Sequence, residues 1–272
     1  MIQQIYIDHQ NTKSGKSAAK NDNNGNNGTG HRADIKVETR GNMIYVNGDS
    51  WSFKSLECTF EIWPEIVAKE LNQPILNDSV GCGSNSRILD NLWYRLLTQN
   101  SETYDLILIG LTSHHRIHLP STTFNSWSAG PDIARHDKNG GSDDSFKKFY
   151  FSKCYDEIGS VYRYFRDIWQ MAEISKKFNS RCICFQMWDT DLNNYALLNS
   201  DDNIHNFVLK YYEQNSYFYQ QYVKAFIKLK KLSEDWEYYE TVPKLLLSDL
   251  DNTGHPNAQG HRKISDHILS KI

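Results

Sequence analysis

The sequence predicts an α/β fold in which helices cover both faces of a parallel sheet of about five strands, a three-layer α/β/α sandwich. Two observations predict it. Short apolar runs alternate with longer segments of helical apolar spacing. That alternation favours parallel strands joined by crossover helices. The run at 104–110 is nearly continuous in its apolar part, as in a strand buried on both faces.

The first half of the chain contains three of the expected strands. Residues 43–46 form a short apolar run that ends in Asn47-Gly48, a turn signal. Residues 54–72 carry apolar side chains near helical spacing, although Pro64 weakens this helix or divides it. Residues 74–76 are a second strand, residues 85–97 a second helix, and residues 104–110 the third strand.

The second half of the chain repeats the alternation after a long polar stretch. Residues 111–150 are rich in Ser, Gly, Asp and His and are expected to be a loop that forms a wall over the site. Helices are expected at 155–178, 206–232 and 258–272, the second being rich in tyrosine. Strands are expected at 181–188 and 244–247.

The chain divides into an N-terminal extension, residues 1–40, and a main domain, residues 41–272. Six Asn and four Gly fall within residues 11–30, where almost nothing is apolar. Such a segment cannot offset its ordering entropy and is expected to be a flexible linker. Residues 2–8, before it, are either an edge strand or disordered.

The composition excludes several functional classes. A formal charge of −3, from 30 basic and 33 acidic side chains, gives no electrostatic case for a nucleic-acid or anionic-membrane partner. No apolar run is long enough to span a membrane, and the N-terminus lacks a signal-peptide pattern, so a cytoplasmic location is expected. Five cysteines without a CxxC pair indicate neither a disulfide framework nor a zinc site. Cys182 and Cys184 should share one face of a strand.

Chemically useful residues follow four of the expected strands. They read Gly-Asp-Ser-Trp at 48–51, Val-Gly-Cys-Gly-Ser-Asn at 80–85, Gly-Leu-Thr-Ser-His-His-Arg at 110–116, and a stretch ending in His-Pro-Asn at 255–257. Ligands of open parallel sheets bind at the carboxyl ends of the strands, so these segments should meet at one edge.

The residue types suit acyl transfer. A serine hydroxyl becomes a good nucleophile when a base removes its proton, and neutral imidazole is such a base near pH 7. Ser50 is the expected nucleophile and His255 the expected base. The N–H groups of Ser50 and Gly83 are expected to bind the oxyanion.

These four stretches resemble the GDSL/SGNH hydrolases. The resemblance covers roughly residues 43–272 and implies a flavodoxin-like, SGNH-type α/β/α fold that hydrolyses esters of lipids, sugars or thiols without a metal or organic cofactor. It assigns Ser50 as nucleophile, Gly83 as an oxyanion donor and His255 as base. The substrate would be a small-molecule, glycan or lipid ester.

The sequence departs from that family's pattern in two places. The family's third block usually reads Gly-x-Asn-Asp, and the Asn side chain completes the oxyanion hole. This chain has Thr112 and Ser113 after Gly110-Leu111. The resemblance implies that the hydroxyl of Thr112 or of Ser113 helps to bind the oxyanion in place of that Asn, and the alternative that neither does so stays open. The family's acid usually lies three residues before the histidine, where this chain has Asn252. Asp251, one residue earlier, is the favoured partner of His255 through a one-residue bulge. Orientation by the Asn252 amide, or a Ser-His dyad, stays open.

Further side chains at the same edge are expected to line a substrate cleft. For two of them an alternative stays open, since Trp51 suits the core equally well and Arg116 could instead pair with a nearby acid. A metal site is not expected at the histidines, because the nearest carboxylate candidates lie in the following loop. The six expected cleft residues are Asp49, Trp51, Asn85, His114, His115 and Arg116.

The expected function is hydrolysis of a carboxylic ester through an acyl-Ser50 intermediate. Two alternatives remain. One is a non-catalytic binding or structural module that keeps the fold, and the other is an O-acyltransferase that acts on a sugar.

Overall fold

The computed structural model describes residues 43–55, 57–81, 83–98, 104–116, 155–187, 194–239, 245, 247–252 and 254–272. The chain divides at residue 40 into two units, and every described residue belongs to the second, Gly41–Ile272. The expected linker at 11–30, the segment 2–8 and most of the loop expected at 111–150 therefore lie outside the described residues.

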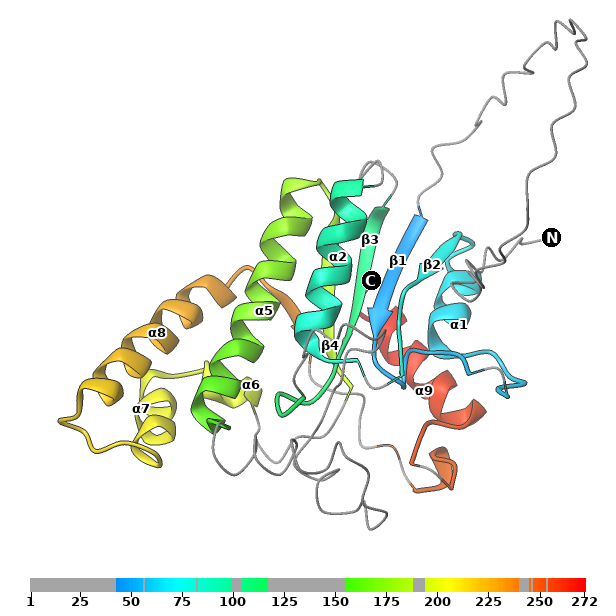
Figure 1. Cartoon of the computed structure of the whole chain (residues 1–272). Coiled ribbons are helices and arrows are strands. Elements are labelled where there is room, and N and C mark those ends of the chain that lie inside the picture. Colours follow the sequence, from blue (N-terminus) through cyan, green and yellow to red (C-terminus); the bar gives the residue numbers. More distant parts are fainter. Residues whose placement is uncertain are drawn as a thin grey trace, which may run out of the picture. The chain divides into compact units, whose positions relative to one another are not determined.

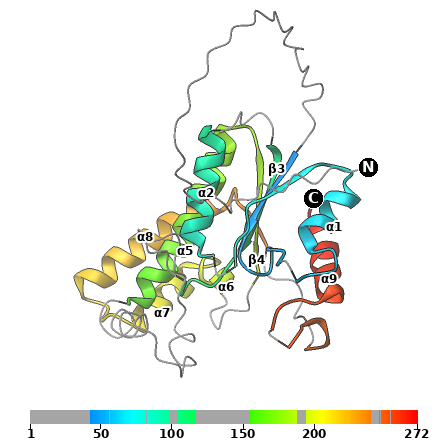
Figure 2. The ribbon, with the colours of Figure 1, turned by 45° about the vertical axis from the view of Figure 1, so that its right-hand side comes forward.

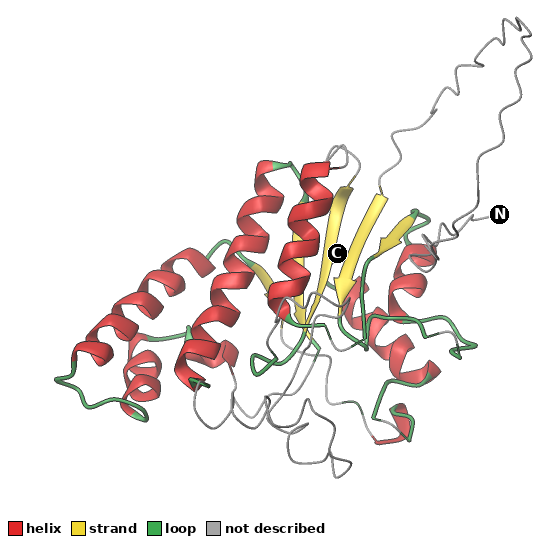
Figure 3. Cartoon of the chain, viewed as in Figure 1, coloured by secondary structure: helices red, strands yellow, loops and turns green. Residues whose placement is uncertain are grey.

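The described strands form one parallel sheet in the order β2-β1-β3-β4-β5 (Figures 1 and 3). This is the doubly wound order of flavodoxin-like folds, in which the chain reverses direction across the sheet between β1 and β3. The strands are β1 (Met43–Gly48), β2 (Ile75–Asn77), β3 (Tyr104–Leu111), β4 (Arg181–Gln186) and β5 (Glu237–Tyr239).

Helices cover both faces of the sheet (Figure 2). On one face lie α1 (Trp63–Glu70) and α9 (Ala258–Leu269). On the other lie α2 (Asn85–Thr98) and α5 (Glu157–Lys177), with α7 (Asp201–Leu209) and α8 (Tyr217–Ser233) packed further out. The short helix α6 (Asn194–Leu197) precedes α7. The three-layer α/β/α sandwich predicted from the sequence is therefore the fold of the described domain.

The two faces of the sheet pack into two separate hydrophobic cores. In β3, Ile107 and Ile109 belong to the core under α2 and α5, whereas Leu106 and Leu108 belong to the core under α1 and α9. Successive side chains of a strand point to opposite faces, so a strand covered on both sides must be apolar throughout. Cys182 and Cys184 share the α5 face, as the sequence predicted.

The first helix is shorter than predicted. The sequence analysis expected helix from residue 54 and a break at Pro64, but α1 begins at Trp63 and Pro64 lies in its first turn. Proline is favoured there, because its missing N–H would have no partner within the helix. The Glu65 carboxylate accepts a hydrogen bond from the N–H of Ile62 at 3.1 Å, which caps the start.

The prediction of one long helix at 206–232 is wrong. It is two helices, α7 and α8, separated by residues 210–216. Ser200 and Ser216 cap them, each accepting a hydrogen bond from a backbone N–H three residues later. The apolar spacing continues across both helices and so does not show where α8 begins. The start of α8 is marked by its serine cap, which is a local signal.

The prediction of a strand at 244–247 is also wrong for the described residues of that range. Leu245 lies outside any strand, and Leu247 begins a 3₁₀ turn, Leu247–Asp249. The fifth strand is the aromatic run Glu237–Tyr239, where buried Tyr238 bonds through its hydroxyl to Gln186 at 2.7 Å. In the part of the chain described here, every helix is too short or too polar to cross a bilayer.

Candidate active site

The end of β1 forms a tight turn around Asp49. Its carboxylate accepts the N–H of Trp51 at 3.0 Å, and its carbonyl accepts the N–H of Ser52 at 3.0 Å. Asp49 is completely buried, whereas Ser50, between these bonded residues, is partly exposed. Asp49 therefore builds the turn that presents Ser50 at the carboxyl end of the sheet.

The loop after β2 packs directly against this turn. The N–H of Val80 donates to the carbonyl of Gly48 at 3.2 Å, and a Cβ at position 83 would lie 3.3 Å from that same carbonyl. The structure thus brings Gly83 beside the turn of Ser50, and its role as an oxyanion donor stays a prediction. The N–H of Gly83 donates to the carbonyl of Val80 at 3.2 Å, so an oxyanion would have to share or displace that bond.

The exit of β3 is tied to the start of α2 by a pair of hydrogen bonds. The Asn85 side chain accepts from the N–H of Thr112 and donates to its carbonyl, both at 2.9 Å. The hydroxyl of Thr112 is buried and has no hydrogen-bond partner in the described part of the chain. Ser113 differs, because its hydroxyl accepts the N–H of His115 at 3.3 Å.

Arg116 joins the three loops. Its Nη1 donates to the Asp49 carboxylate at 3.1 Å and to the carbonyl of Gly83 at 3.3 Å. The arginine side chain is 12% exposed and that of Asp49 0%, so the pair is screened little by water. Of the two roles left open by the sequence, pairing with a nearby acid is the one observed.

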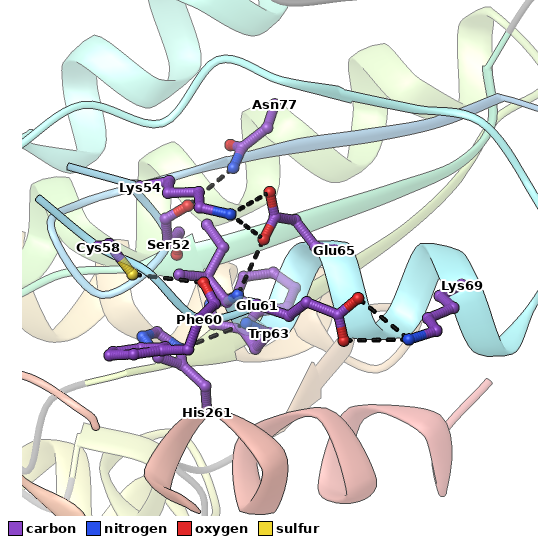
Figure 4. A network of polar contacts seen from close by, with 11 residues as sticks. Ser52, Lys54, Cys58, Phe60, Glu61, Trp63, Glu65, Lys69, Asn77 and His261 are labelled. Atoms are coloured by element: carbon purple, nitrogen blue, oxygen red, sulfur yellow. Dashed lines mark hydrogen bonds and ion pairs between the residues drawn. The ribbon is translucent and has the colours of Figure 1, made fainter. Parts of the chain in front are cut away.

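The connection from Ser50 to α1 is held from three sides (Figure 4). The Asn77 side chain donates to the carbonyl of Ser52 at 2.8 Å, and Lys54 pairs with Glu65 at 2.8 Å. Farther along, the N–H of Trp63 donates to Nδ1 of His261 on α9 at 3.2 Å. The connection therefore links β1 to β2, α1 and α9.

His255 lies in a short loop that is tied to the start of α9. Asn257 caps the helix by accepting the N–H groups of Gln259 and Gly260, and its amide donates back to the carbonyls of Ser248 and Leu250. Asn257 therefore fixes the loop of His255 against the first turn of α9. Beneath the loop, the buried Asp249 carboxylate pairs with Lys263 at 2.7 Å.

Asp251 contacts the main chain of His255. Its carboxylate accepts the His255 N–H at 3.0 Å, and its own N–H donates to the His255 carbonyl at 2.7 Å. Asp251 and Asn252 are both exposed. Asp251 therefore shapes the loop around the histidine through bonds to the backbone of His255, and orientation of the imidazole by Asp251 or by Asn252 stays a prediction.

The imidazole of His261 links α9 to the start of α1. Its Nδ1 accepts the N–H of Trp63, the first residue of α1, at 3.2 Å. Burial lowers the pKa of His261 to about 4, while Glu65 raises it and His255 lowers it by smaller amounts. The loop of His255, which leads directly into α9, is thus tied through that helix to the helix start that follows the turn of Ser50.

Most of the predicted cleft residues lie beneath the surface. Asp49, Trp51, Asn85 and His114 are at most 8% exposed, and Trp51 packs in the core under α1 and α9. For Trp51 the core position, one of the two alternatives left open, is the one observed. A place in a substrate cleft stays a prediction for Asp49, Asn85 and His114, and the side chains of Asp49 and Asn85 form hydrogen bonds that hold the loops together. His115 and Arg116 remain partly exposed.

Sequence reasoning missed two residues beside the histidines. Glu157, the first residue of α5, bonds to Nε2 of His114 at 2.9 Å, and Tyr155 bonds to Nδ1 of His115 at 2.5 Å. The sequence analysis sought a carboxylate in the loop that follows the histidines. Acidic residues in the first turn of a helix are a general preference, so Glu157 carried no signal of its own.

Solved structures similar to this chain include lipolytic enzymes. TesA has 12% identity and a TM-score of 0.46, with 84% of this chain and 97% of that protein covered. The psychrotrophic esterase EstA from Pseudoalteromonas sp. has 14% identity and a TM-score of 0.46, with 85% and 96% covered. A GDSL-like lipase from Bacteroides thetaiotaomicron has 10% identity and a TM-score of 0.42, with 84% and 86% covered. No family model matches the sequence, and no curated protein does either.

Proposed function

We propose that this protein is a serine-dependent hydrolase of carboxylic esters, with Ser50 as nucleophile and His255 as general base. The observation that carries the proposal is the convergence of three loops on the turn of Ser50. Arg116 bonds to both Asp49 and Gly83, so the ends of β1 and β3 and the loop after β2 form one connected unit. Ser50 stays partly exposed on this unit.

The reaction begins when Ser50 Oγ attacks the ester carbonyl and His255 takes the hydroxyl proton. The carbonyl oxygen becomes an oxyanion, and the C–O bond to the alcohol breaks as His255 returns the proton to the leaving oxygen. Water, deprotonated by His255, then attacks the acyl-Ser50 carbonyl, and the bond from carbon to Oγ breaks as His255 returns the proton to Oγ, which releases the acid. Both steps need the imidazole within hydrogen-bond reach of Oγ. Support comes from α9, which begins three residues after His255 and bonds through His261 to the start of α1.

Three donors of this chain suit the oxyanion. No described residue accepts a hydrogen bond from the Ser50 N–H. Between the two hydroxyl candidates, we favour Thr112 over Ser113, because the Thr112 hydroxyl is buried without a described partner. Gly83 contributes by its close approach to Gly48 and shares its N–H with Val80.

We assign Asp251 to the positioning of His255. Its carboxylate holds the His255 N–H and so sets the turn that carries the imidazole. Asn252, for which the described residues show no bond to His255, is the weaker candidate.

The direct test is labelling with a fluorophosphonate probe, which reacts with activated serines. We expect modification of Ser50, located by mass spectrometry of the labelled peptide. Ser50→Ala and His255→Ala should abolish labelling, and Ser55→Ala, an exposed serine of the same connection, should leave it unchanged. Labelling that survives Ser50→Ala would refute the assignment of the nucleophile.

A panel of p-nitrophenyl esters of rising chain length would then define the acyl group. If folded protein is neither labelled nor active on any ester, the chain is a non-catalytic binding or structural module. If it forms acyl-Ser50 but passes the acyl group to an added sugar in preference to water, it is an O-acyltransferase.

A further inference from the structure

Three side chains of the kind that bind metals converge beside the exit of β3. The ligand atoms of His114, His115 and Glu157 all lie within 4.8 Å of one another. The histidines directly follow the β3 exit and the carboxylate opens α5, about forty residues later. The reaction proposed above uses none of them.

The donor atoms face one another. Nε2 of His114 lies 2.9 Å from one carboxylate oxygen of Glu157, and Nδ1 of His115 lies 3.5 Å from the other. The two imidazole rings are 3.8 Å apart between centroids. The hydroxyl of Tyr155 bonds to both His115 and Glu157 and adds a fourth donor atom to the group.

The cluster is rigid on one side and open on the other. The His114 side chain is fully buried, whereas those of His115 and Glu157 are 28% and 23% exposed. The loop that carries the histidines is fixed by the bonds between Asn85 and Thr112 and by Arg116. A ligand from solvent can therefore reach donors that are already in place, which limits the entropy lost on binding.

We propose that His114, His115 and Glu157 bind one divalent transition-metal ion, for which Zn²⁺ is the best match. Two imidazole nitrogens and one carboxylate are a common ligand set of zinc and of non-haem iron. Ligands about 2.1 Å from a tetrahedral ion stand roughly 3.4 Å apart, close to the donor separations here. Mg²⁺ and Ca²⁺ prefer oxygen ligands, so a set with two nitrogens disfavours them.

Binding would replace hydrogen bonds by coordinate bonds. Nε2 of His114 and Nδ1 of His115 would each present a lone pair to the ion, and each ring would keep its proton on its other nitrogen. The Tyr155 hydroxyl or a water would complete the fourth position. The ion would join the exit of β3 to the first turn of α5, so it would stabilise the folded chain in proportion to its affinity.

The test is a calorimetric titration of the full-length chain with ZnCl₂ at pH 7.5. EDTA first removes any bound metal and is then dialysed away. We expect one Zn²⁺ per chain at this site, a rise in melting temperature on binding, and no comparable response to MgCl₂. His115→Ala and Glu157→Gln should each weaken binding at least tenfold.

The matched control is His205→Ala. His205 bonds through Nδ1 to the hydroxyl of Tyr219 at 2.6 Å, so the variant removes a similar histidine–tyrosine contact from a place without a described third ligand. It should bind Zn²⁺ as the unaltered chain does. If Glu157→Gln does not fold, His115→Ala alone decides, since that side chain is partly exposed.

Two outcomes would overturn the proposal. One is the absence of Zn²⁺ binding by the folded chain, and the other is binding that His115→Ala does not weaken. The site shares no residue with the proposed hydrolase chemistry. Ser50→Ala should therefore bind Zn²⁺ with unchanged affinity. The failure of one proposal therefore leaves the other testable.

Discussion

At the scale of single residues, the polar groups of this sheet edge divide into those that are bonded and those that are not. The side chains of Asp49 and Asn85 form hydrogen bonds that hold the turn after β1 and the neighbouring loops. The buried hydroxyl of Thr112 lacks a described partner, and such a group costs about 1–3 kcal/mol of stability. This hydroxyl, at the exit of β3, is therefore the residue on which the proposed oxyanion hole can be tested most directly.

Thr112→Val should separate stability from activity. Valine has nearly the same shape and removes only the hydroxyl, so the free energy of unfolding should stay the same or rise. If the hydroxyl binds the oxyanion, kcat on a p-nitrophenyl ester should fall about 100-fold. Urea unfolding and steady-state kinetics measure both quantities. Ser113→Ala is the control, and equal kcat losses in the two variants would contradict the assignment.

Arg116→Ala should destabilise the chain strongly. The change leaves the buried Asp49 carboxylate without its described cationic partner, and removal of one member of a buried pair costs about 3–5 kcal/mol. Urea unfolding measures the loss. Arg262→Ala removes an exposed pair with Glu70 and should cost less than about 1 kcal/mol. A similar cost for both variants would show that the Arg116 pair does not hold the loops.

His261 should make stability depend on pH. Burial lowers its pKa in the folded chain from 6.5 to about 4, so between these values the unfolded state binds more protons. Stability from this group is therefore present above about pH 6.5 and is lost as the pH falls toward 4. The loss should reach about 2 kcal/mol at pH 5.

The measurement is urea unfolding at pH 7.5 and pH 5. His261→Gln keeps a side-chain acceptor for the N–H of Trp63 and removes the titrating imidazole, so its stability should fall less between the two pH values. Equal losses in the two proteins would assign the acid sensitivity to other groups.

At the scale of elements, the loop that carries His255 depends on how closely α9 approaches it. A Cβ added at Gly260 would lie 2.3 Å from the carbonyl oxygen of Asp249 and 3.0 Å from Pro256. Because the first of these atoms is backbone, the loop would have to move away from the helix. Glycine at position 260 therefore sets the position of the proposed base.

Gly260→Ala should lower both stability and turnover. Overpacking of this kind costs about 1–3 kcal/mol, and displacement of the loop should reduce kcat more than it changes KM. Gly81→Ala, at a position with no atom within 4 Å of the added Cβ, should change neither. Wild-type kcat in the Gly260→Ala variant would show that the loop position is unimportant.

At the scale of the whole molecule, the described domain carries its own cores. Among the described residues, one hydrophobic cluster lies on each face of the sheet, and Gly41–Ile272 is a compact unit by itself. The unit Gly41–Ile272 should therefore fold without residues 1–40.

A variant that begins at residue 41 should keep the melting temperature and the ester turnover of the full chain. Thermal unfolding followed by circular dichroism gives the first quantity, and p-nitrophenyl ester hydrolysis gives the second. A fall of more than about 5 °C, equivalent to 1 kcal/mol or more in a domain of this size, would show that the first forty residues contribute to the fold.

The parallel sandwich followed from the sequence because its signals are local and repeated. Residues 104–110 are apolar enough for a strand covered on both faces, and the helical spacing of 85–97, 155–178 and 258–272 matches α2, α5 and α9 closely. The same spacing failed where one residue decides the boundary, at Pro64 and at the cap Ser216. The fifth strand was misplaced, since three-residue edge strands carry too few side chains for a reliable pattern.

The amino-acid sequence by itself determined the fold class and the segments that meet at the edge of the sheet, because parallel strands deliver their carboxyl ends to one side. Only the tertiary structure decided how those segments bond to one another. The contacts of Arg116 with Asp49, of Glu157 with His114 and of Trp63 with His261 join residues between 43 and 198 positions apart. No local pattern encodes such pairs, since they depend on how the loops pack once the sheet has formed.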